Sequence, residues 1–361
     1  MGSTMVKATG EPLVYIILVN YKNWQDTAEC LESLFKLSYH NYKVVVVDND
    51  SKNNSVTYLK NWAEGLLSVS YDEQFYTSTP ISSSPISKPI SYIHADSESI
   101  HTLNSIEKRL LLIESKKNLG FAGGNNLGCK LALAHNADYI WLLNNDTVVE
   151  QESLTHMVAR FEVSKSKKEQ LGMLGSKLLY YHTPNLIQAI LGRYKPFTAS
   201  TEHIGLNKAS CTTFDNLKIE DDDYVVGASM FVSAEFVKEV GLMSEAYFLY
   251  FEEIDWVKRG AAKNFKIDIC LKANIYHKEG AAIGGSTKEN NNKSELSDFY
   301  SIRNRLIITK KYYPRFLYPV YLSLIAVAAN RVRRKQFSRI PLILKAFKSF
   351  KKNTLWKAQI D

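Results

Sequence analysis

Three short apolar runs in the first 150 residues predict strands that are buried on both faces. Residues 14–19, 42–47 and 139–143 are almost wholly aliphatic or aromatic, and each run ends in polar turn-forming residues. Continuous apolar runs of this length are typical of strands inside a parallel sheet. Residues 24–37 lie between the first two runs and have apolar side chains at helical spacing. The order strand, helix, strand therefore predicts a right-handed parallel unit.

After residue 48 the chain continues to alternate predicted helices and strands, with one Ser- and Pro-rich segment between them. Residues 55–64 predict a helix, residues 110–114 a strand, and residues 125–136 a helix that follows a glycine-rich turn. Ser and Pro dominate residues 77–91, so we expect a mobile insertion near residues 68–109 rather than part of a core. Alternating strands and helices predict an α/β fold.

Polar side chains follow the predicted strands. Asn20, Asp48 and Asp146 come directly after them, at the edge where open α/β sheets bind ligands. A carboxylate there can hold Mg²⁺ or Mn²⁺ against a diphosphate. Asp146 could equally cap the next helix, with Glu150 or Glu152 in its first turn.

Charge is distributed unevenly along the 361 residues. The net charge is +8, but residues 303–361 contain 15 Lys and Arg against one acid, so they carry +14 and the rest carries −6. A basic tail on an acidic body fits contact with an anionic membrane surface, and we expect no nucleic-acid partner. The four cysteines are widely spaced, which indicates buried thiols in a reducing cytosol. Residues 1–12 have no apolar signal core and are expected to be disordered or vector-derived.

A series of motifs in order resembles the family 2 inverting glycosyltransferases, and in particular their bacterial rhamnosyltransferase-like branch. The resemblance covers residues 13–310 and is carried by residues 19–21 (Val-Asn-Tyr), 47–49 (Val-Asp-Asn), 118–125 (Asn-Leu-Gly-Phe-Ala-Gly-Gly-Asn), 143–147 (Leu-Asn-Asn-Asp-Thr), 225–230 (Val-Val-Gly-Ala-Ser-Met), 248–256 (Phe-Leu-Tyr-Phe-Glu-Glu-Ile-Asp-Trp) and 300–305 (Tyr-Ser-Ile-Arg-Asn-Arg).

This resemblance implies a GT-A fold, a Rossmann-like mixed sheet flanked by helices, with a nucleotide-sugar half at residues 13–150 and an acceptor half at 151–310. It implies inverting transfer of a sugar, with L-rhamnose from dTDP-L-rhamnose as first choice, onto a cell-surface polysaccharide such as O-antigen or a lipid-linked glycan. The alternatives are a transferase using a UDP-sugar, or a catalytically silent protein that only binds nucleotide or glycan.

The same resemblance implies roles for individual residues. The nucleotide-sugar would contact Asn20, Tyr21, Asp48, Asn118, Gly120, Gly123, Gly124, Asn145, Asp146 and Arg303. The acceptor would lie against Gly227, Ala228 and Glu252. Asp146 would bind the Mg²⁺ or Mn²⁺ ion, with His277 completing its shell; the chain has Asn144 where the first acid of an Asp-x-Asp motif often stands.

The acidic run 252–255 provides the candidates for catalysis. An inverting transfer needs a carboxylate that takes the proton from the acceptor hydroxyl. Family precedent makes Glu253 the first choice, although an aspartate is usual there, and Asp255 the second. The competing interpretation is a solvated helix start rich in acids.

The tail predicts a helical, basic extension over residues 311–361. Residues 316–329 are apolar but too few to span a bilayer. Beyond them, Lys and Arg alternate with large apolar residues at helical spacing, which predicts a helix in the plane of an anionic membrane. The alternative is a basic helix packed on the body or at a dimer interface. We therefore expect a cytoplasmic protein, peripheral at the inner face of the membrane, with a loop at residues 280–293 that closes over the donor.

Overall fold

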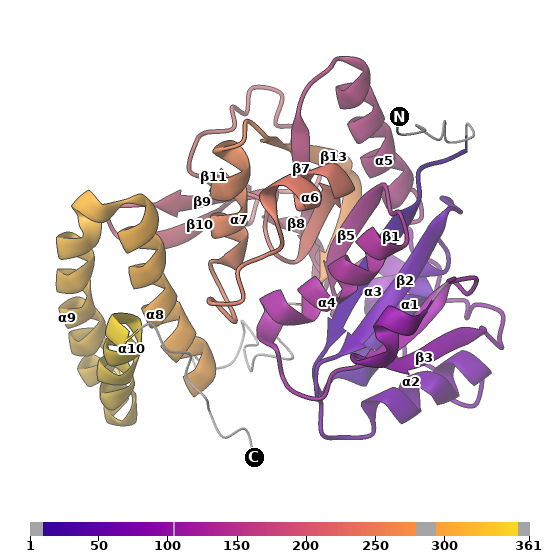
Figure 1. Cartoon of the computed structure of the whole chain (residues 1–361), viewed down its shortest axis with the longest axis horizontal. Helices are drawn as coiled ribbons and strands as arrows, with labels where there is room; N and C mark the ends of the chain where they lie inside the picture. Colours follow the sequence, from indigo (N-terminus) through magenta and orange to yellow (C-terminus); the bar gives the residue numbers. More distant parts are fainter. Residues whose placement is uncertain (1–9, 104, 279–293, 353–361) are drawn as a thin grey trace.

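The computed structural model describes residues 10–103, 105–278 and 294–352. Of the segment 1–12 that was predicted to be disordered or vector-derived, residues 1–9 lie outside the described residues. The predicted closing loop at 280–293 and the end of the tail beyond residue 352 also lie outside them. In the described part, ten strands form one mixed sheet and three more form a small second sheet, with helices on both faces of the large sheet (Figure 1).

The predicted parallel unit forms the N-terminal half of the large sheet. Strands β1 (Val14–Asn20), β2 (Tyr42–Asp48), β4 (Leu110–Glu114) and β5 (Tyr139–Asn144) run parallel in the order β4-β2-β1-β5. Helices α1 (Trp24–Leu34), α2 (Ser55–Glu64) and α4 (Gly120–Ala134) connect them. Parallel strands share one carboxyl edge, so the polar residues that follow them meet there.

The C-terminal half extends the sheet with strands of both directions. Strand β12 (Ser229–Ser233) runs antiparallel to β5, followed by β7 (Leu171–Tyr180) and β13 (Lys266–His277), with β8 (Thr183–Ala189) paired to β7. The short strand β6 (Thr147–Val149) leaves β5 after a tight turn and pairs with the end of β13. This half also contains helices α5 (Ser153–Ser166), α6 (Ala234–Val240) and α7 (Glu252–Ala261). The fold prediction of a mixed α/β sheet is confirmed.

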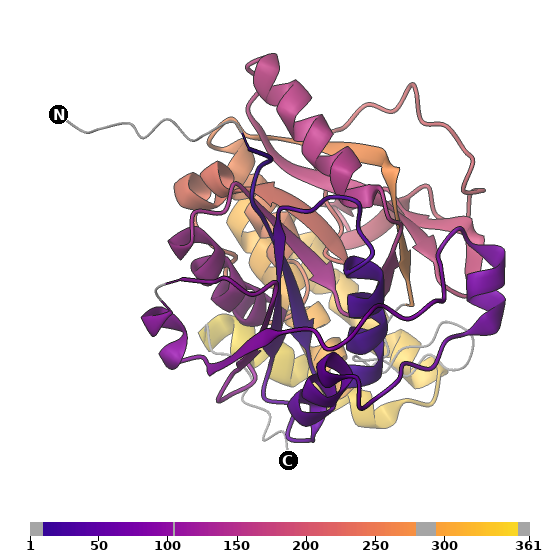
Figure 2. The same ribbon diagram turned by 90° about the vertical axis from the view of Figure 1, so that its right-hand side faces the viewer.

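A small sheet lies between the large sheet and the C-terminal helices (Figure 1). It consists of β10 (Ser200–Ile204), β9 (Leu191–Lys195) and β11 (Asp223–Tyr224), in the order β10-β9-β11. In Figure 2 the molecule is turned so that the N-terminal strands face the viewer, with the C-terminal helices behind them.

The insertion is packed on the body, so the expectation of a mobile segment is corrected. It contains α3 (Glu73–Ser78), the edge strand β3 (Tyr92–Asp96) and the 3-10 turn η1 (Ser99–Thr102). Between them, the Glu32 carboxylate of α1 accepts hydrogen bonds from the Ile86 backbone N–H at 2.9 Å and from Lys88 Nζ at 2.8 Å. A buried carboxylate can thus hold a Ser/Pro-rich segment that has few apolar side chains of its own.

Helix α4 begins at Gly120, five residues earlier than predicted, because its glycines serve close packing. Gly120 has a φ of +70°, and a Cβ there would lie 2.3 Å from the Phe248 carbonyl oxygen. A Cβ on Gly124 would lie 2.9 Å from Val19, and one on Gly123 2.7 Å from Leu119. The glycines therefore let α4 lie directly on β1 and beside the loop that contains Phe248.

The C-terminal tail folds back as three helices, α8 (Glu295–Tyr312), α9 (Leu317–Arg333) and α10 (Ile340–Lys352), with 3-10 turns η2 (Pro314–Phe316) and η3 (Phe337–Arg339). The apolar side of α10, including Leu342, Ile343 and Ala346, is buried, and α10 packs on α8. Basic residues are used as well: Arg331 and Arg339 both pair with Asp298 of α8. The prediction of a lipid-facing helix is thus corrected for α10, which packs on the body. Among the described helices, none is both long and apolar enough to cross a membrane.

Candidate functional site

The carboxyl ends of β1, β2 and β5 are joined by one hydrogen-bond network. Asn20 is fully buried and donates from Nδ2 to Asp48 Oδ2 at 3.3 Å, while its Oδ1 accepts from Thr27 Oγ1 at 2.9 Å. Thr27 Oγ1 in turn accepts from Asn145 Nδ2 at 2.8 Å. Burial raises the pKa of Asp48, against hydrogen bonds from Ser51 and Asn20 that lower it. Of the residues predicted for the nucleotide-sugar, Asn20, Asp48 and Asn145 are therefore brought together.

A residue that the sequence analysis did not single out organises the neighbouring glycine-rich turn. Asn49 donates from Nδ2 to Asn118 Oδ1 at 3.1 Å and to the Gly120 carbonyl at 3.0 Å, and its Oδ1 accepts the Leu119 N–H at 2.9 Å. The amide oxygen of Asn118 is thus used in hydrogen bonds within the turn. The only sequence signal for Asn49 was its position directly after Asp48.

A polar cavity of about 240 Å³ opens at the carboxyl ends of β2 and β4. Its lining is polar and charged, with the exceptions of Val56 and the stems of two lysines: Asp48, Asp50, Ser51, Lys52, Asn53, Asn54, Val56, Thr57, Lys60, Glu114 and Ser115. Tyr21 lies partly exposed just after β1, with Lys22 Nζ 5.1 Å from its ring centroid. Hydroxyl, amide and carboxylate groups around a cavity of this size suit a ribose and a base.

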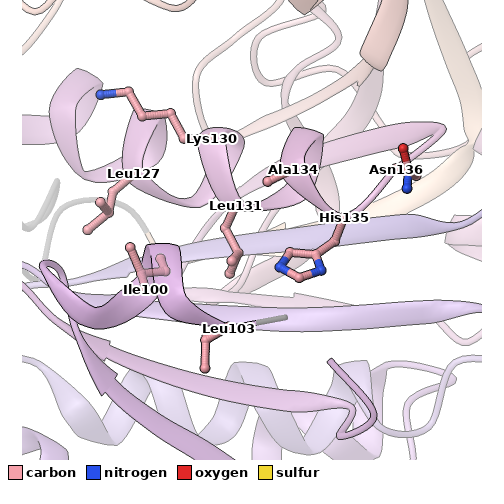
Figure 3. A pocket seen from close by; sticks show the side chains of 8 residues that line it. All are labelled: Ile100, Leu103, Leu127, Lys130, Leu131, Ala134, His135 and Asn136. Atoms are coloured by element: carbon pink, nitrogen blue, oxygen red, sulfur yellow. The ribbon is translucent and has the colours of Figure 1, made fainter. Parts of the chain in front are cut away.

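A larger cavity of about 410 Å³ has a different character (Figure 3). It lies between the C-terminal half of α4 and η1, where Leu127 and Leu131 face Ile100 and Leu103. None of the predicted site residues lines it. The polar cavity is therefore the one that belongs to the sheet edge.

The two residues predicted to hold a metal ion lie side by side. His277, at the end of β13, places Nε2 3.2 Å from Asp146 Oδ1 and 3.2 Å from Asn144 Nδ2. Its Nδ1 lies 2.7 Å from Gln188 Oε1, a contact that fixes the orientation of the ring. When the ring proton is on Nδ1, Nε2 and the Asp146 carboxylate oxygen are neighbouring acceptors beside the Asn144 amide, and a cation bound between them would stabilise this arrangement.

The Asp146 carboxylate and the His277 imidazole could supply only some of the ligands that Mn²⁺ or Mg²⁺ requires. Carboxylate and imidazole suit Mn²⁺, and both ions usually take remaining ligands from substrate phosphates and water. Within residues 10–103, 105–278 and 294–352, three or more His, Cys, Asp or Glu side chains nowhere group as a metal cluster. Asn144 in place of an acid accounts for this at the sheet edge. Gln188, which holds the imidazole, gave no sequence signal because it lies within a strand.

Short contacts connect this edge to the predicted acceptor residues. The Ala228 carbonyl accepts the Asn144 N–H at 2.9 Å, and an added Cβ on Gly227 would lie 3.8 Å from the Phe121 ring. The Phe121 N–H donates to the Phe248 carbonyl at 2.7 Å. Phe248 belongs to the loop that precedes α7, so the acidic run is linked to the donor edge through α4.

The loop before the acidic run is held in an unusual backbone conformation. Phe248, Tyr250 and Phe251 have φ values of +64°, +70° and +73°, which non-glycine residues rarely adopt. Asn304 Nδ2 donates to the carbonyls of Tyr247, Leu249 and Tyr250 at 2.8 to 3.0 Å. Local strain of this kind persists where surrounding contacts impose it, and it concentrates at functional sites.

The first residues of α7 carry two carboxyl groups with raised pKa values. Burial raises the pKa of Glu253 to about 7, and its side chain stays partly exposed. Burial and then the Glu253 charge raise the pKa of Glu252 well above its usual range. Glu252 is 3% exposed, and its Oε2 has no hydrogen-bond partner among the described residues. A carboxyl group with a pKa near 7 is well matched to general base catalysis at neutral pH.

Asp255, the second candidate base, lies in a closed ionic cluster. It is fully buried, and its carboxylate binds Arg259 at 2.8 Å and Lys311 at 2.6 Å, besides the Tyr247 and Tyr312 hydroxyls. Burial alone would raise its pKa, but the hydrogen bonds from Lys311 and Arg259 outweigh burial and lower it. An occupied, weakly basic carboxylate is a poor proton acceptor, so Asp255 is a structural residue here.

Arg303 also differs from its predicted role. Its guanidinium is 1% exposed and donates to the Ala246 carbonyl at 2.8 Å, to Asn304 Oδ1 at 2.9 Å and to Ser349 Oγ of α10 at 3.1 Å. These contacts fix the loop before α7 and the tail. They make Arg303 a support for that loop.

Known proteins resemble this chain in sequence and in fold. The family model described as glycosyl transferase family 2 matches residues 15–75. The low-salt glycan biosynthesis hexosyltransferase Agl10 of Haloferax volcanii is 23% identical over 265 residues, which span 73% of this chain and 66% of that protein, just under two thirds of its length.

Two solved structures share the fold at low sequence identity. The mannosyltransferase PcManGT from Pyrobaculum calidifontis, in complex with GDP-Man and Mn²⁺, is 10% identical with a TM-score of 0.50, covering 95% of this chain and 88% of that one. GalNAc-T7 with UDP, GalNAc and Mn²⁺ is 12% identical with a TM-score of 0.55, covering 96% and 57%. The fold is therefore of the GT-A type. The family model and the hexosyltransferase relative, together with this fold, support a family 2 glycosyltransferase.

Proposed function

We propose that this protein is an inverting glycosyltransferase that moves a hexosyl group from a nucleoside-diphosphate sugar onto a surface-glycan or lipid-linked acceptor. The first candidate donor is dTDP-L-rhamnose, from the motif resemblance, with UDP- and GDP-sugars as rivals. One observation carries the proposal: Glu253, with a pKa near 7, follows a strained loop that is bonded to the turn lining the donor edge.

Glu253 acts as the general base in this scheme. It takes the proton of the acceptor hydroxyl while the oxygen attacks the anomeric carbon, and the bond to the diphosphate breaks with its electron pair. Attack from the side opposite the diphosphate inverts the configuration. A Mg²⁺ or Mn²⁺ ion, when bound by Asp146 and His277, would neutralise the departing diphosphate. Asn20, Asp48 and Asn145 orient the nucleotide through their shared network.

A two-step assay tests this function. First, thermal unfolding is followed with dTDP, UDP and GDP and their sugars, because a ligand of the folded state raises the melting temperature. Second, donor turnover is measured with Mn²⁺ for the ligands that bind. We expect slow donor hydrolysis by the native protein and loss of at least about 100-fold in Glu253→Gln. Nucleotide binding without any turnover above background would favour the silent binder instead.

The metal assignment has its own test. Mn²⁺ together with a nucleoside diphosphate is expected to raise the melting temperature more than either alone, because the ion bridges protein and diphosphate. His277→Ala and Asp146→Asn should remove this synergy, while the exposed substitution His40→Ala keeps it. Synergy that survives in both site variants would contradict the assignment.

We also propose that the protein binds an anionic membrane, through α9 rather than α10. Tyr318, Leu322, Ile325 and Val332 are exposed and recur at helical spacing on one side of α9; Tyr318 is 70% and Ile325 67% exposed. The exposed residues 333–335 (Arg-Arg-Lys) follow at its end. An apolar stripe beside cations is what an interfacial helix presents to anionic lipid.

Vesicle sedimentation tests this surface. The native protein should sediment with vesicles of one third phosphatidylglycerol and remain in solution with pure phosphatidylcholine. Leu322→Glu with Ile325→Glu should abolish sedimentation, whereas Lys351→Glu with Lys352→Glu, at the end of α10, should reduce it less. Equal sedimentation of the α9 variant, or its conversion of a stable dimer to a monomer, would contradict a lipid partner.

A further inference from the structure

Two arginines of α8 that lie two residues apart have opposite surroundings. Arg303 is enclosed by hydrogen-bond acceptors. Arg305 is partly buried, yet its Nε is shielded from solvent without a hydrogen-bond partner in the described chain, and no described carboxylate pairs with its guanidinium. Shielding an unpaired charge from water is costly, and an anion that arrives as a ligand can offset that cost.

The neighbours of Arg305 place it on the acceptor half. Burial raises the pKa of the Tyr194 hydroxyl of β9, and the nearby Arg305 charge acts against this rise; the hydroxyl lies 3.1 Å from Thr309 Oγ1, one turn further along α8. The Tyr194 ring meets the Phe251 ring edge to face at a centroid distance of 6.2 Å. Phe251 directly precedes Glu252 and Glu253. Arg305 is therefore connected to the start of α7 through the Tyr194 and Phe251 rings.

The same strand connects to Glu253 from its other end. Gly192 of β9 lies under the Tyr224 ring, where an added Cβ would be 2.1 Å from Cζ, and the Glu253 charge acts on the Tyr224 hydroxyl. Arg305 makes no ion pair with Glu253, and the pKa of Glu253 stays raised. Arg305 therefore does not neutralise the proposed base.

The donor edge and Arg305 are connected to different parts of the strained loop at residues 248–251. Asp146 and His277 lie at the ends of β5 and β13, while Phe248 packs between Gly120 of α4 and the stacked Tyr300 ring at 4.8 Å. Arg305 lies on α8 beside Tyr194 of β9, and Tyr194 contacts Phe251 at the start of α7. We propose that Arg305 binds an anionic group of the acceptor, a phosphate or a carboxylate, on the β9 side of α7; this rests on the proposed function.

The stability of three variants tests the unpaired state of Arg305. Arg305→Met removes a charge that lacks a partner, so we expect an equal or higher melting temperature than that of the native protein. Arg303→Met, which breaks satisfied hydrogen bonds, should lower it, and the exposed substitution Arg315→Met should leave it unchanged. A clear loss of stability in Arg305→Met would reveal a partner in the chain and overturn the proposal.

Anion binding is tested separately, with methyl phosphate and glucuronate as probes. At least one of them should raise the melting temperature of the native protein and of Arg315→Met in a saturable way, and of Arg305→Met much less. Protection by methyl phosphate alone identifies a phosphate, and protection by glucuronate alone a carboxylate. Identical protection in Arg305→Met, or no protection by either probe in the native protein, would overturn the proposal.

Kinetics distinguish this site from the donor site. With a donor identified by the binding screen, Arg305→Met should keep donor hydrolysis and donor KM within about twofold, and raise the KM for an acceptor that bears the protective anion at least tenfold. A raised donor KM would assign Arg305 to the donor diphosphate and overturn the proposal while leaving the transferase function intact. Absence of donor turnover in the native protein would contradict the function, but not the Arg305-dependent anion protection.

Discussion

Replacing Glu253 by glutamine should make the protein more stable at alkaline pH while it removes catalysis. Burial raises the pKa of Glu253 from 4.5 to about 7. Because each pKa unit corresponds to ~1.4 kcal/mol, ionising this side chain costs the fold about 3 kcal/mol relative to the unfolded chain, and partial exposure reduces this to ~2 kcal/mol.

The sign follows from proton linkage. A carboxyl group whose pKa is raised in the fold binds its proton more tightly there, so its stabilising effect is complete below about pH 4.5 and is lost as pH rises through 7. Glutamine stays neutral throughout. The stability of Glu253→Gln relative to the native protein should therefore increase between pH 5 and pH 8.5 by ~2 kcal/mol.

Urea unfolding at a series of pH values measures this difference, with Glu239→Gln as the exposed control. The free energy of unfolding of the control should vary with pH in the same way as that of the native protein. The neighbouring Glu252 adds a change of the same sign, because its pKa is raised in part by the Glu253 charge. A stability difference that does not vary with pH would refute the raised pKa, and transfer activity within tenfold of native in Glu253→Gln would refute its role as base.

Three substitutions test the supports of the site. Asn49→Ala should lower the free energy of unfolding by about 2 kcal/mol, measured in urea, because it removes the hydrogen bonds of Asn49 to Asn118 Oδ1, to the Gly120 carbonyl and from the Leu119 N–H. Asp255→Asn should cost about 3 kcal/mol at pH 7 and less near pH 3, since a lowered pKa gives stability that disappears as the native carboxylate is protonated; an unchanged cost at pH 3 would contradict this. Gly128→Ala should cost ~1–3 kcal/mol in thermal unfolding, because its Cβ would lie 2.6 Å from Ile17, and a neutral result would show that α4 can move away from β1.

The strands that carry the donor edge could be predicted because each is an uninterrupted apolar run. In β1 and β5 every residue before the polar end is aliphatic or aromatic, and in β2 only Lys43 is not, so the length of each apolar run and the turn residues after it identify the strands. The adjacent positions of Asn20 and Asp48 then follow from parallel pairing. Helix α4 was placed too far along the chain because glycine normally disfavours helices, whereas here close packing on β1 requires it.

The roles of single polar residues depended on contacts that sequence does not reveal. Arg303 was the predicted anion ligand, and Arg305 stands in the same motif; residues two apart point to different sides of a helix, and only the three-dimensional neighbours distinguish them. Asp255 was a plausible base until Lys311, 56 residues later, was found beside it. Gln188 and Asn304 act on His277 and on the strained loop over similar distances in the chain.

The fold-back of the tail has a consequence for how this protein can vary. Ser349 of α10 bonds to Arg303, which also binds the Ala246 carbonyl in front of the strained loop. Helix α10, which the sequence suggests is a separate membrane-binding segment, thus stabilises the loop in front of the proposed base. Shortening the tail for expression, or exchanging it for another sequence, would remove the contact between Ser349 and Arg303 and loosen the loop in front of Glu253.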